Sequence, residues 1–275
     1  MKILRVHTVY FSATGTTERV VNELAGELAE RLGAELVSHC FNLPQSREET
    51  LTFGPEDLVV VGLPVYAGRV PNLLLPYLRE KVKGNDTPAV PVVLFGNRDF
   101  DDGLIELRDT LWDNGLRSVA AGAFAGEHAF SKTLGAGRPD EQDMELVSQL
   151  ARHAAEKIEQ AEQAPARPVP VEGCTPLRPY YTPRDRNGTP INILKVKPRT
   201  DLQKCVSCGL CARLCPMGSI DPEEVVRVTG VCIKCCACVK KCPAGAKYFD
   251  DAGFLYHQHE LEELYARRAD SRIFF

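Results

Sequence analysis

The sequence predicts an α/β fold: a five-stranded, doubly wound parallel sheet followed by a small α+β domain. Two observations lead to this prediction. Short apolar runs alternate with helical patterns over residues 1–163, as they do in parallel sheets covered by helices on both faces. Nine of the eleven cysteines then gather between Cys205 and Cys242, which marks a second unit. At 275 residues, the chain also exceeds the usual size of one domain.

The first strand is expected at Ile3–Phe11, a β-branched apolar run. The helix after it carries an apolar stripe that includes Val20, Leu24 and Leu28, and Gly33 ends it. Further strands are expected at Leu36–Phe41, Leu58–Leu63, Val90–Phe95 and Val119–Phe124. Further helices are expected at Asn72–Val82, Gly103–Asn114 and Glu141–Gln163.

These patterns divide the chain into four segments. Residues 1–163 form the α/β domain, and residues 164–200 form a linker with eight prolines, which is expected to be an extended arm. Residues 201–250 form the cysteine-rich domain. Residues 251–275 form a C-terminal helical tail, because Leu261, Leu264 and Tyr265 have helical spacing.

Charge is distributed unevenly between these segments. Residues 1–163 carry 16 basic and 25 acidic side chains, a net charge of −9, whereas residues 164–250 carry 14 and 7, a net charge of +7. The basic stretch is too mixed and too Pro-rich to indicate nucleic-acid binding, so it is interpreted as a solvated linker or as a face that meets the acidic domain. No apolar run is long enough to span a bilayer, so no membrane insertion is expected.

The cysteines form two copies of the run C-x2-C-x2-C-x3-C-P, which bacterial two-cluster ferredoxins use to hold two [4Fe–4S] clusters. The fourth cysteine of each run lies too far along the chain to close its own cluster, and it ligates the other one. One cluster is therefore expected on Cys205, Cys208, Cys211 and Cys242, and the other on Cys232, Cys235, Cys238 and Cys215.

Zinc and disulfide bonds are the alternatives. A structural zinc site needs four ligands in two pairs, whereas this stretch has nine cysteines and no histidine. No secretory signal peptide is visible, and thiols that stay reduced indicate the cytoplasm. Cys236 is an extra cysteine beside Cys235 and is interpreted as a small inert thiol, while Cys40 and Cys174 are interpreted as structural.

The loop after the first strand predicts an anion site. It supplies hydroxyls and free backbone N–H groups at a helix N-terminus, where one terminal phosphate fits. It has neither the lysine of a Walker A loop nor the pattern G-x-G-x-x-G. Its residues are Ser12, Ala13, Thr14, Gly15, Thr16 and Thr17.

Two more loops are expected at the same edge, since ligands of doubly wound sheets bind at the carboxyl ends of the strands. Each contains one aromatic residue that could lie on a planar ring system, Tyr66 in one and Phe100 in the other. The loop after the third strand contains Pro64, Val65, Tyr66, Ala67 and Gly68. The loop after the fourth contains Gly96, Asn97, Arg98, Asp99, Phe100 and Asp101.

At these residues, segment 1–163 resembles a flavodoxin. The whole chain, with its two cysteine runs, resembles the flavodoxin–ferredoxin fusion proteins of anaerobic bacteria and archaea. The resemblance implies FMN as a cofactor, with its phosphate on Ser12 and on Thr14 to Thr17. It also implies that Tyr66 stacks on the isoalloxazine, that Ala67 and Gly68 lie near flavin N5, and that Phe100 is the second stacking ring. The sequence departs from the family at Thr16, where flavodoxins usually have Asn.

The leading hypothesis is an electron-transfer protein in which the clusters exchange electrons with FMN and with a redox protein partner: a ferredoxin, a flavodoxin or a reductase. The alternative is a flavin-dependent reductase of a small molecule, with His128 as a candidate proton donor; whether the protein is an enzyme stays open. Charge complementarity predicts that the ferredoxin unit docks at the loops around Tyr66 and Phe100. This docking would occur within one chain or, through the Pro-rich arm, in a head-to-tail homodimer.

Overall fold

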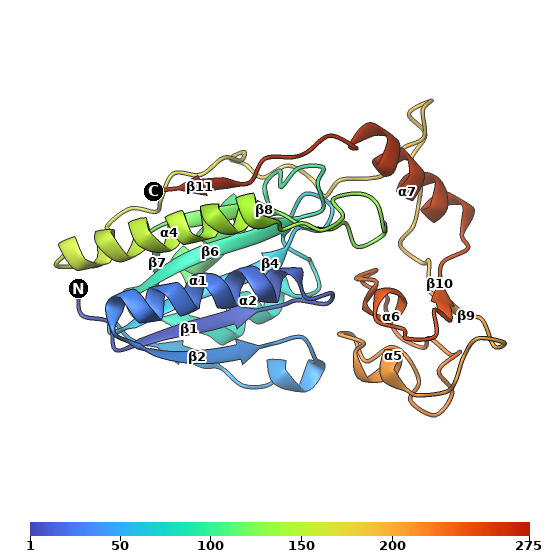
Figure 1. Cartoon of the computed structure of the whole chain (residues 1–275), viewed down its shortest axis with the longest axis horizontal. Helices are drawn as coiled ribbons and strands as arrows, with labels where there is room; N and C mark the ends of the chain where they lie inside the picture. Colours follow the sequence, from blue (N-terminus) through green and yellow to red (C-terminus); the bar gives the residue numbers. More distant parts are fainter.

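Five parallel strands form the centre of a sheet in the computed structural model, which describes residues 1–275. They are β1 (Arg5–Tyr10), β2 (Glu35–Cys40), β4 (Asp57–Pro64), β6 (Thr87–Phe95) and β8 (Ala121–Ala125). They lie in the order β2-β1-β4-β6-β8 (Figure 1), which is the flavodoxin-like strand order with a switch point between β1 and the next parallel strand, β4. The predicted doubly wound parallel sheet is confirmed.

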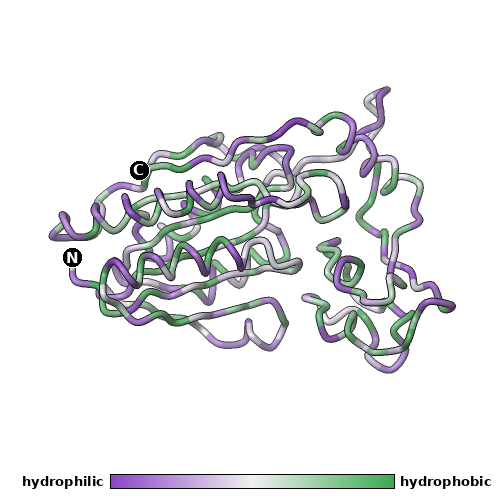
Figure 2. Tube along the Cα trace, viewed as in Figure 1, coloured by the Kyte–Doolittle hydropathy of each residue, from purple (hydrophilic) through white to green (hydrophobic).

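The central strands are apolar along their whole length because helices cover both of their faces. Every residue of β6 is buried, and β4 is buried up to Leu63. Figure 2 shows this as hydrophobic colour that runs through the middle of the sheet. α1 (Thr16–Leu32) and α4 (Glu141–Gln160) pack on one face, and α2 (Leu75–Lys81) and α3 (Gly103–Asp113) pack on the other.

The sheet is wider than the sequence predicted. β7 (Leu116–Ser118) pairs with β6, and β11 (Arg272–Phe274) pairs antiparallel with β8, so seven strands take part. β3 (Leu51–Phe53) and β5 (Val82–Gly84) form a separate pair after a short 3-10 turn at Pro44–Arg47. Segments of three residues are too short to show a periodicity, which is why these strands were missed.

Residues 161–198 contain no helix or named strand, and this linker is fastened to the α/β domain. The fully buried carboxylate of Asp102 accepts hydrogen bonds from the backbone N–H groups of Cys174 (3.0 Å) and Arg178 (2.7 Å). It also accepts one from the Arg178 guanidinium (2.5 Å). The Arg178 side chain is the main reason why the pKa of Asp102 lies below its usual value.

The cysteine-rich segment folds into a small α+β unit beyond the carboxyl ends of the strands (Figure 1). β9 (Arg199–Thr200) and β10 (Lys247–Tyr248) pair antiparallel and join its two ends. Two one-turn helices, α5 (Leu210–Arg213) and α6 (Ala237–Lys240), each contain the third cysteine of a run.

The C-terminal tail forms α7 (Ala252–Leu264), as predicted, and then returns to the sheet as β11. Asn97 holds this return. Its amide nitrogen donates to the carbonyl oxygens of Tyr265 (2.8 Å) and Arg267 (2.7 Å), and its amide oxygen accepts from the N–H of Ala269 (3.2 Å). The α/β domain is therefore completed by the last residues of the chain.

Candidate functional site

The loop Ser12–Thr17 connects β1 to α1 at the switch point of the sheet. Gly15 has a φ of 107°, a conformation that favours glycine, and it turns the chain into the helix. The Ser12 hydroxyl accepts from the N–H of Glu18 (3.0 Å), so it holds the loop in shape. The N–H of Arg19 donates to the carbonyl oxygen of Gly15, whereas the N–H groups of Thr14, Gly15, Thr16 and Thr17 have no acceptor in the protein. These groups form a ready anion cradle.

Asn42 fixes this loop from the end of the neighbouring strand. Its amide oxygen accepts from the N–H of Ser12 (2.6 Å), and its amide nitrogen donates to the carbonyl oxygen of the same residue (3.0 Å). The sequence analysis missed Asn42, because only its position directly after β2, at the same edge of the sheet, connects it with the loop.

Tyr66 begins a tight turn after β4. Tyr66 and Arg69 exchange two backbone hydrogen bonds (2.9 and 3.1 Å) around Ala67 (φ 52°) and Gly68 (φ 77°). Two successive left-handed residues are the signature of a type I′ turn. Glu106 holds the turn by accepting two hydrogen bonds from the Arg69 guanidinium (2.8 and 2.7 Å). Such a bidentate pair keeps the turn rigid.

The Tyr66 ring lies at a cavity of about 820 Å³, within the usual size range of cofactor pockets. Burial raises the pKa of the Tyr66 phenol well above its ordinary value, with smaller contributions from Cys235, Cys236 and Cys232. The hydroxyl therefore stays protonated, and the ring is a neutral aromatic surface.

Most of the predicted cofactor residues line this one cavity. From the phosphate loop these are Ala13, Thr14, Thr16 and Thr17; from the loop after β4, Pro64, Val65, Tyr66, Ala67 and Gly68; and from the loop after β6, Gly96, Arg98 and Asp99. Ser12, Gly15, Asn97, Phe100 and Asp101 do not line it. The structure thus brings the three predicted loops together, although some of their members have other tasks.

Phe100 is the main departure from the expected site. It is 2% exposed and packs in the core against Phe95 (ring centroids 5.6 Å apart) and Phe274 (6.4 Å). The structure therefore gives no support to Phe100 as a second stacking ring. Its partner Phe274 lies on β11, which the sequence did not predict.

Segments distant in sequence complete the cavity. They come from the linker, from the loop after β8, from α7 and from the second cysteine run: Tyr180 to Pro183, Pro190 to Leu194, Gly126 to Phe130, His257, Leu261 and Val231 to Lys234. The N–H of Tyr181 donates to the carbonyl oxygen of Ala67 (2.8 Å), which ties the linker to the Tyr66 turn. Arg98 lies 4.8 Å from the centre of the Tyr181 ring, in a cation–π contact.

Two histidines on the cavity wall are uncharged at neutral pH. Burial is the main cause that lowers the pKa of His128 to about 4, and the same cause lowers that of His257 to about 4. The Nδ1 atom of His128 accepts from the N–H of Phe130 (3.1 Å), so its proton is on Nε2. Gly96 leaves room for this ring, since a Cβ at position 96 would lie 2.3 Å from His128 Cδ2.

The cysteines form two sets around two small cavities in the ferredoxin-like unit. Cys205, Cys208, Cys211 and Cys242 line one cavity. Cys215, Cys232, Cys235 and Cys238 line the other, together with the extra cysteine, Cys236. In each set the fourth thiol comes from the other run, which is the arrangement expected from the spacing. Nowhere in the chain do three such side chains converge as around a single metal ion.

The two runs have matching backbone conformations. Ser207 and Lys234 have φ values of 51° and 56°, and the next pair, Gly209 and Cys236, has 70° and 58°. Cys236 thus stands where the first run has a left-handed glycine. It is 3% exposed, and burial raises the pKa of its thiol well above the ordinary value. These features fit the inert thiol that the sequence analysis expected.

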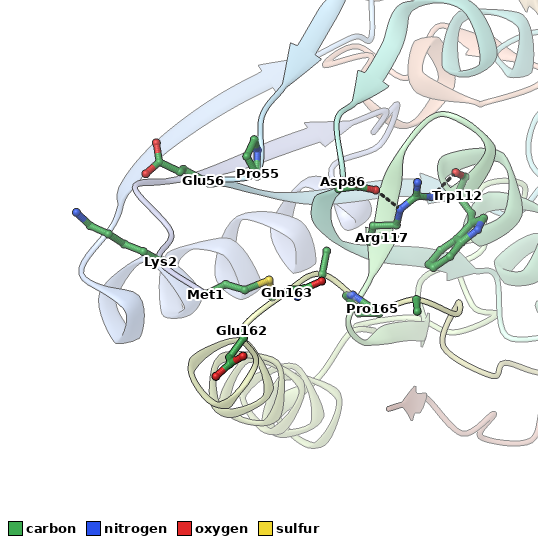
Figure 3. A pocket seen from close by; sticks show the side chains of 12 residues that line it. Met1, Lys2, Pro55, Glu56, Asp86, Trp112, Arg117, Glu162, Gln163 and Pro165 are labelled. Carbon is green, nitrogen blue, oxygen red and sulfur yellow. Dashed lines mark hydrogen bonds and ion pairs between the residues drawn. The ribbon is translucent and has the colours of Figure 1, made fainter.

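A second concavity of about 810 Å³ lies at the opposite end of the sheet, between Met1, Trp112 and the start of the linker (Figure 3). The guanidinium group of Arg117 lines this concavity and is already paired, because it donates to Asp86 (2.8 Å) and lies over the Trp112 ring. It offers no cradle of free donors, so the cavity at Tyr66 is the candidate site.

Comparison with known families assigns the second unit: residues 197–243 match the model of a 4Fe-4S dicluster domain. The match contains all the cysteines of both sets. The chain combines a flavodoxin-like fold with a 4Fe–4S domain. No match was found among curated proteins.

Several solved structures are similar to the α/β part. A flavodoxin from the domain Archaea is 12% identical, with 57% of this chain and 100% of that chain covered and a TM-score of 0.38. A flavodoxin from Streptococcus pneumonia TIGR4 is 18% identical, with 56% of this chain and 99% of that chain covered and a TM-score of 0.40. A rubredoxin oxygen:oxidoreductase from the anaerobe Desulfovibrio gigas is 15% identical, with 57% of this chain and 37% of that chain covered and a TM-score of 0.38. Scores this low add no argument of their own, so the fold assignment rests on the strand order.

No helix of the chain has both the length and the apolar character that a membrane-spanning segment requires.

Proposed function

We propose that this chain is an electron-transfer protein that moves electrons between two [4Fe–4S] clusters and FMN and exchanges them with a redox protein partner. The observation that carries the proposal is that the Tyr66 turn and the loop Cys232–Lys234 line the same cavity. Transfer of electrons falls off steeply with distance, so a ligand loop at the wall of the flavin cavity is the placement that such a transfer requires.

The residues fit FMN at one end of the cavity. The phosphate would lie on the free N–H groups and hydroxyls of Thr14, Thr16 and Thr17, and the ring system would lie against Tyr66. FMN, when bound, accepts and donates one or two electrons. The protein holds it in place, and Ile233, which packs against the apolar core of the α/β domain, keeps the cysteine loop against the cavity.

The other set of cysteines supports exchange with a partner. Cys208 is exposed, and the neighbouring Val206 is 69% exposed, so one cluster would lie at the surface, whereas Cys235 in the other set is buried. The exposed apolar residue beside a basic rim of Lys204 and Arg213 suits a redox protein with an acidic face. Electrons would pass from the partner to this outer cluster, then to the inner cluster and to FMN.

The reductase alternative is weakened by the state of His128. A proton donor for hydride chemistry needs an acidic proton near neutral pH, and His128 is neutral because its pKa is about 4. Its Nε2–H is a neutral hydrogen-bond donor.

The test is anaerobic purification followed by stopped-flow reduction with a reduced ferredoxin. We expect FMN and the iron of two clusters in the purified protein, with the clusters bleached before the flavin. Loss of flavin reduction in Cys235→Ala, which retains FMN, would support the route. Flavin reduction at an unchanged rate in that variant would contradict it, and turnover of a small molecule after removal of the clusters would favour a reductase.

A further inference from the structure

The two cysteine runs are equivalent residue by residue, and the equivalence extends past the last cysteine of each. Gly218 and Gly245 both have a φ of 59°. The N–H of Ser219 donates to Cys215 Sγ and that of Ala246 to Cys242 Sγ, both at 3.3 Å. The next residues are therefore structurally equivalent. In the first run this residue is Ile220, and in the second it is Lys247.

Lys247 is a buried cation with no carboxylate partner. It is 3% exposed, it is the only buried lysine in the chain, and it forms no ion pair. Its Nζ donates one hydrogen bond, to the carbonyl oxygen of Val225 (2.5 Å). Burying an ammonium group without a counter-charge is unfavourable, because the charge loses its hydration and gains no partner.

The missing counter-charge lies in the cavity that Lys247 lines. Its other walls include the thiols of Cys205, Cys208, Cys211 and Cys242, and no second charged side chain lines it. A cube of four irons held by four thiolates is net negative, so it compensates the ammonium. Lys247 is thus an independent indication that an anionic group occupies this cavity.

The other cavity has no such cation. Ile220 is 5% exposed and lines it, and no charged side chain does so. The lysines nearby donate to backbone carbonyl oxygens at more exposed positions, Lys197 to Val228 (2.8 Å) and Lys234 to Leu194 (2.7 Å). Water screens charges at such positions much more than a buried charge.

We propose that Lys247 makes the cluster held by Cys205, Cys208, Cys211 and Cys242 the more easily reduced of the two, so that the first electron rests there. The inference rests on the proposed function. Each electron that a cluster accepts adds one negative charge, and a buried cation at its wall stabilises that charge in a medium of low dielectric constant. The electron comes from the redox protein partner, which loses one electron.

This assignment gives the two clusters different tasks. The loop Cys232–Lys234 lies at the flavin cavity, and no charged side chain lines the cavity of the inner cysteine set, so the inner cluster is harder to reduce. The outer cluster stores an electron beside Lys247, and the inner cluster passes it on. Lys247 is a positioning residue for charge, since it does not ligate iron.

The test is Lys247→Ile, which makes the second run match the first. Anaerobic redox titration followed by EPR should show two cluster potentials in the unmodified protein. In the variant, the more positive potential should shift to a more negative value, while the other moves much less. The matched control is Lys204→Gln, which removes a 63% exposed side-chain cation beside Cys205 and should give a much smaller shift.

Two further variants keep the test decisive. Lys247→Arg retains the charge and should retain the potential, and Ile220→Lys should raise the other potential. If Lys247→Ile loses iron, Lys247→Met keeps an unbranched side chain and replaces it in the titration. Two loaded clusters with unchanged potentials after loss of the Lys247 charge would overturn this inference alone, whereas an unmodified protein without two clusters would overturn the proposed function.

Discussion

The Lys240 ammonium group joins the two halves of the molecule. It lies on α6, between Cys238 and Cys242 in the sequence, and donates to the Glu127 carboxylate and to the carbonyl oxygen of His128 (2.8 Å) in the loop after β8. An acidic sheet domain and a basic ferredoxin-like unit thus meet through a cation and an anion at the cavity edge. The two side chains are 15% and 35% exposed, so salt screens the pair only in part.

Lys240→Met should loosen this contact by about 1–2 kcal/mol, because a charged hydrogen bond and an ion pair are lost. The expected result is slower electron exchange between the clusters and FMN, with a smaller salt dependence than in the unmodified protein. Flash reduction of FMN at low and high salt measures both.

The control for that variant is Lys241→Met, since Lys241 is the exposed neighbour and forms no ion pair. An equal effect of the two substitutions would contradict a specific role for Lys240. A rate that rises with protein concentration would instead point to exchange between two copies of the chain.

Cys242→Ala should lower the iron content of the protein, whereas Cys236→Gly should leave it unchanged. Cys242 lines the cavity of Cys205, Cys208 and Cys211, so its loss should damage the cluster in that cavity. The cluster of the second run, which is nearer to Cys242 in the sequence, should be spared. Cys236→Gly should leave both clusters intact and leave stability unchanged or higher by about 1 kcal/mol, because a left-handed conformation suits glycine. Iron analysis and EPR measure how many clusters each variant holds. A Cys236 variant with half the iron would refute the assignment of four cysteines to each cluster.

Tyr66→Ala should weaken FMN binding at least about tenfold, because a stacked ring and its apolar contact contribute about 1.5 kcal/mol. Tyr248→Ala is the control, since Tyr248 is 40% exposed on β10 and does not line the cavity. Binding of FMN to the flavin-free protein measures the difference. Equal affinities of the two variants would remove Tyr66 from the site, and FAD as the extracted flavin would refute the single-phosphate cradle.

Acid should destabilise the protein through His128 and His257. Both have a folded-state pKa of about 4, below the ordinary value of 6.5, so the unfolded chain binds more protons between these values. Their contribution is fully present above pH 6.5 and is lost as the pH falls toward 4. For each histidine, the free energy of unfolding should fall by about 1 kcal/mol as the pH is lowered from 7.5 to 5.5.

Urea unfolding at those two pH values tests this. Replacing both histidines by glutamine should flatten the pH dependence, although Arg98, Lys240 and Glu262 around them stay in place. His153→Gln, at a half-exposed position on α4, should leave the dependence as it is. An unchanged slope in the double variant would show that folding does not lower the pKa of these two rings.

The sequence predicted the sheet well, because it is written in local patterns, whereas the assignment of the cysteines to two clusters stays a prediction. The buried strands are continuous apolar runs, and the spacing of the cysteines predicts which thiols meet. The three loops at the carboxyl ends were also predictable, since a parallel sheet brings the ends of β1, β4 and β6 to one edge.

The remaining features depend on contacts between distant segments. Phe100 reads as a loop aromatic until Phe274, far along the chain, covers it. Tyr181 carries no pattern that would place it on the cavity, and the pairing of Lys240 with Glu127 depends on how two units pack. Lys247 was predictable in part, because aligning the two runs shows lysine where the other has isoleucine.

The return of the chain as β11 changes what kind of protein architecture this is. β1 and β11 belong to one sheet, and the iron–sulfur unit lies between α4 and β11 in the sequence. The unit is therefore inserted into the α/β domain and is not appended to it. An appended unit swings on one tether, whereas an inserted one is restrained at both ends. A truncated protein of residues 1–163 would lack β11, so β8 would become an unpaired edge strand. Unpaired edge strands promote aggregation.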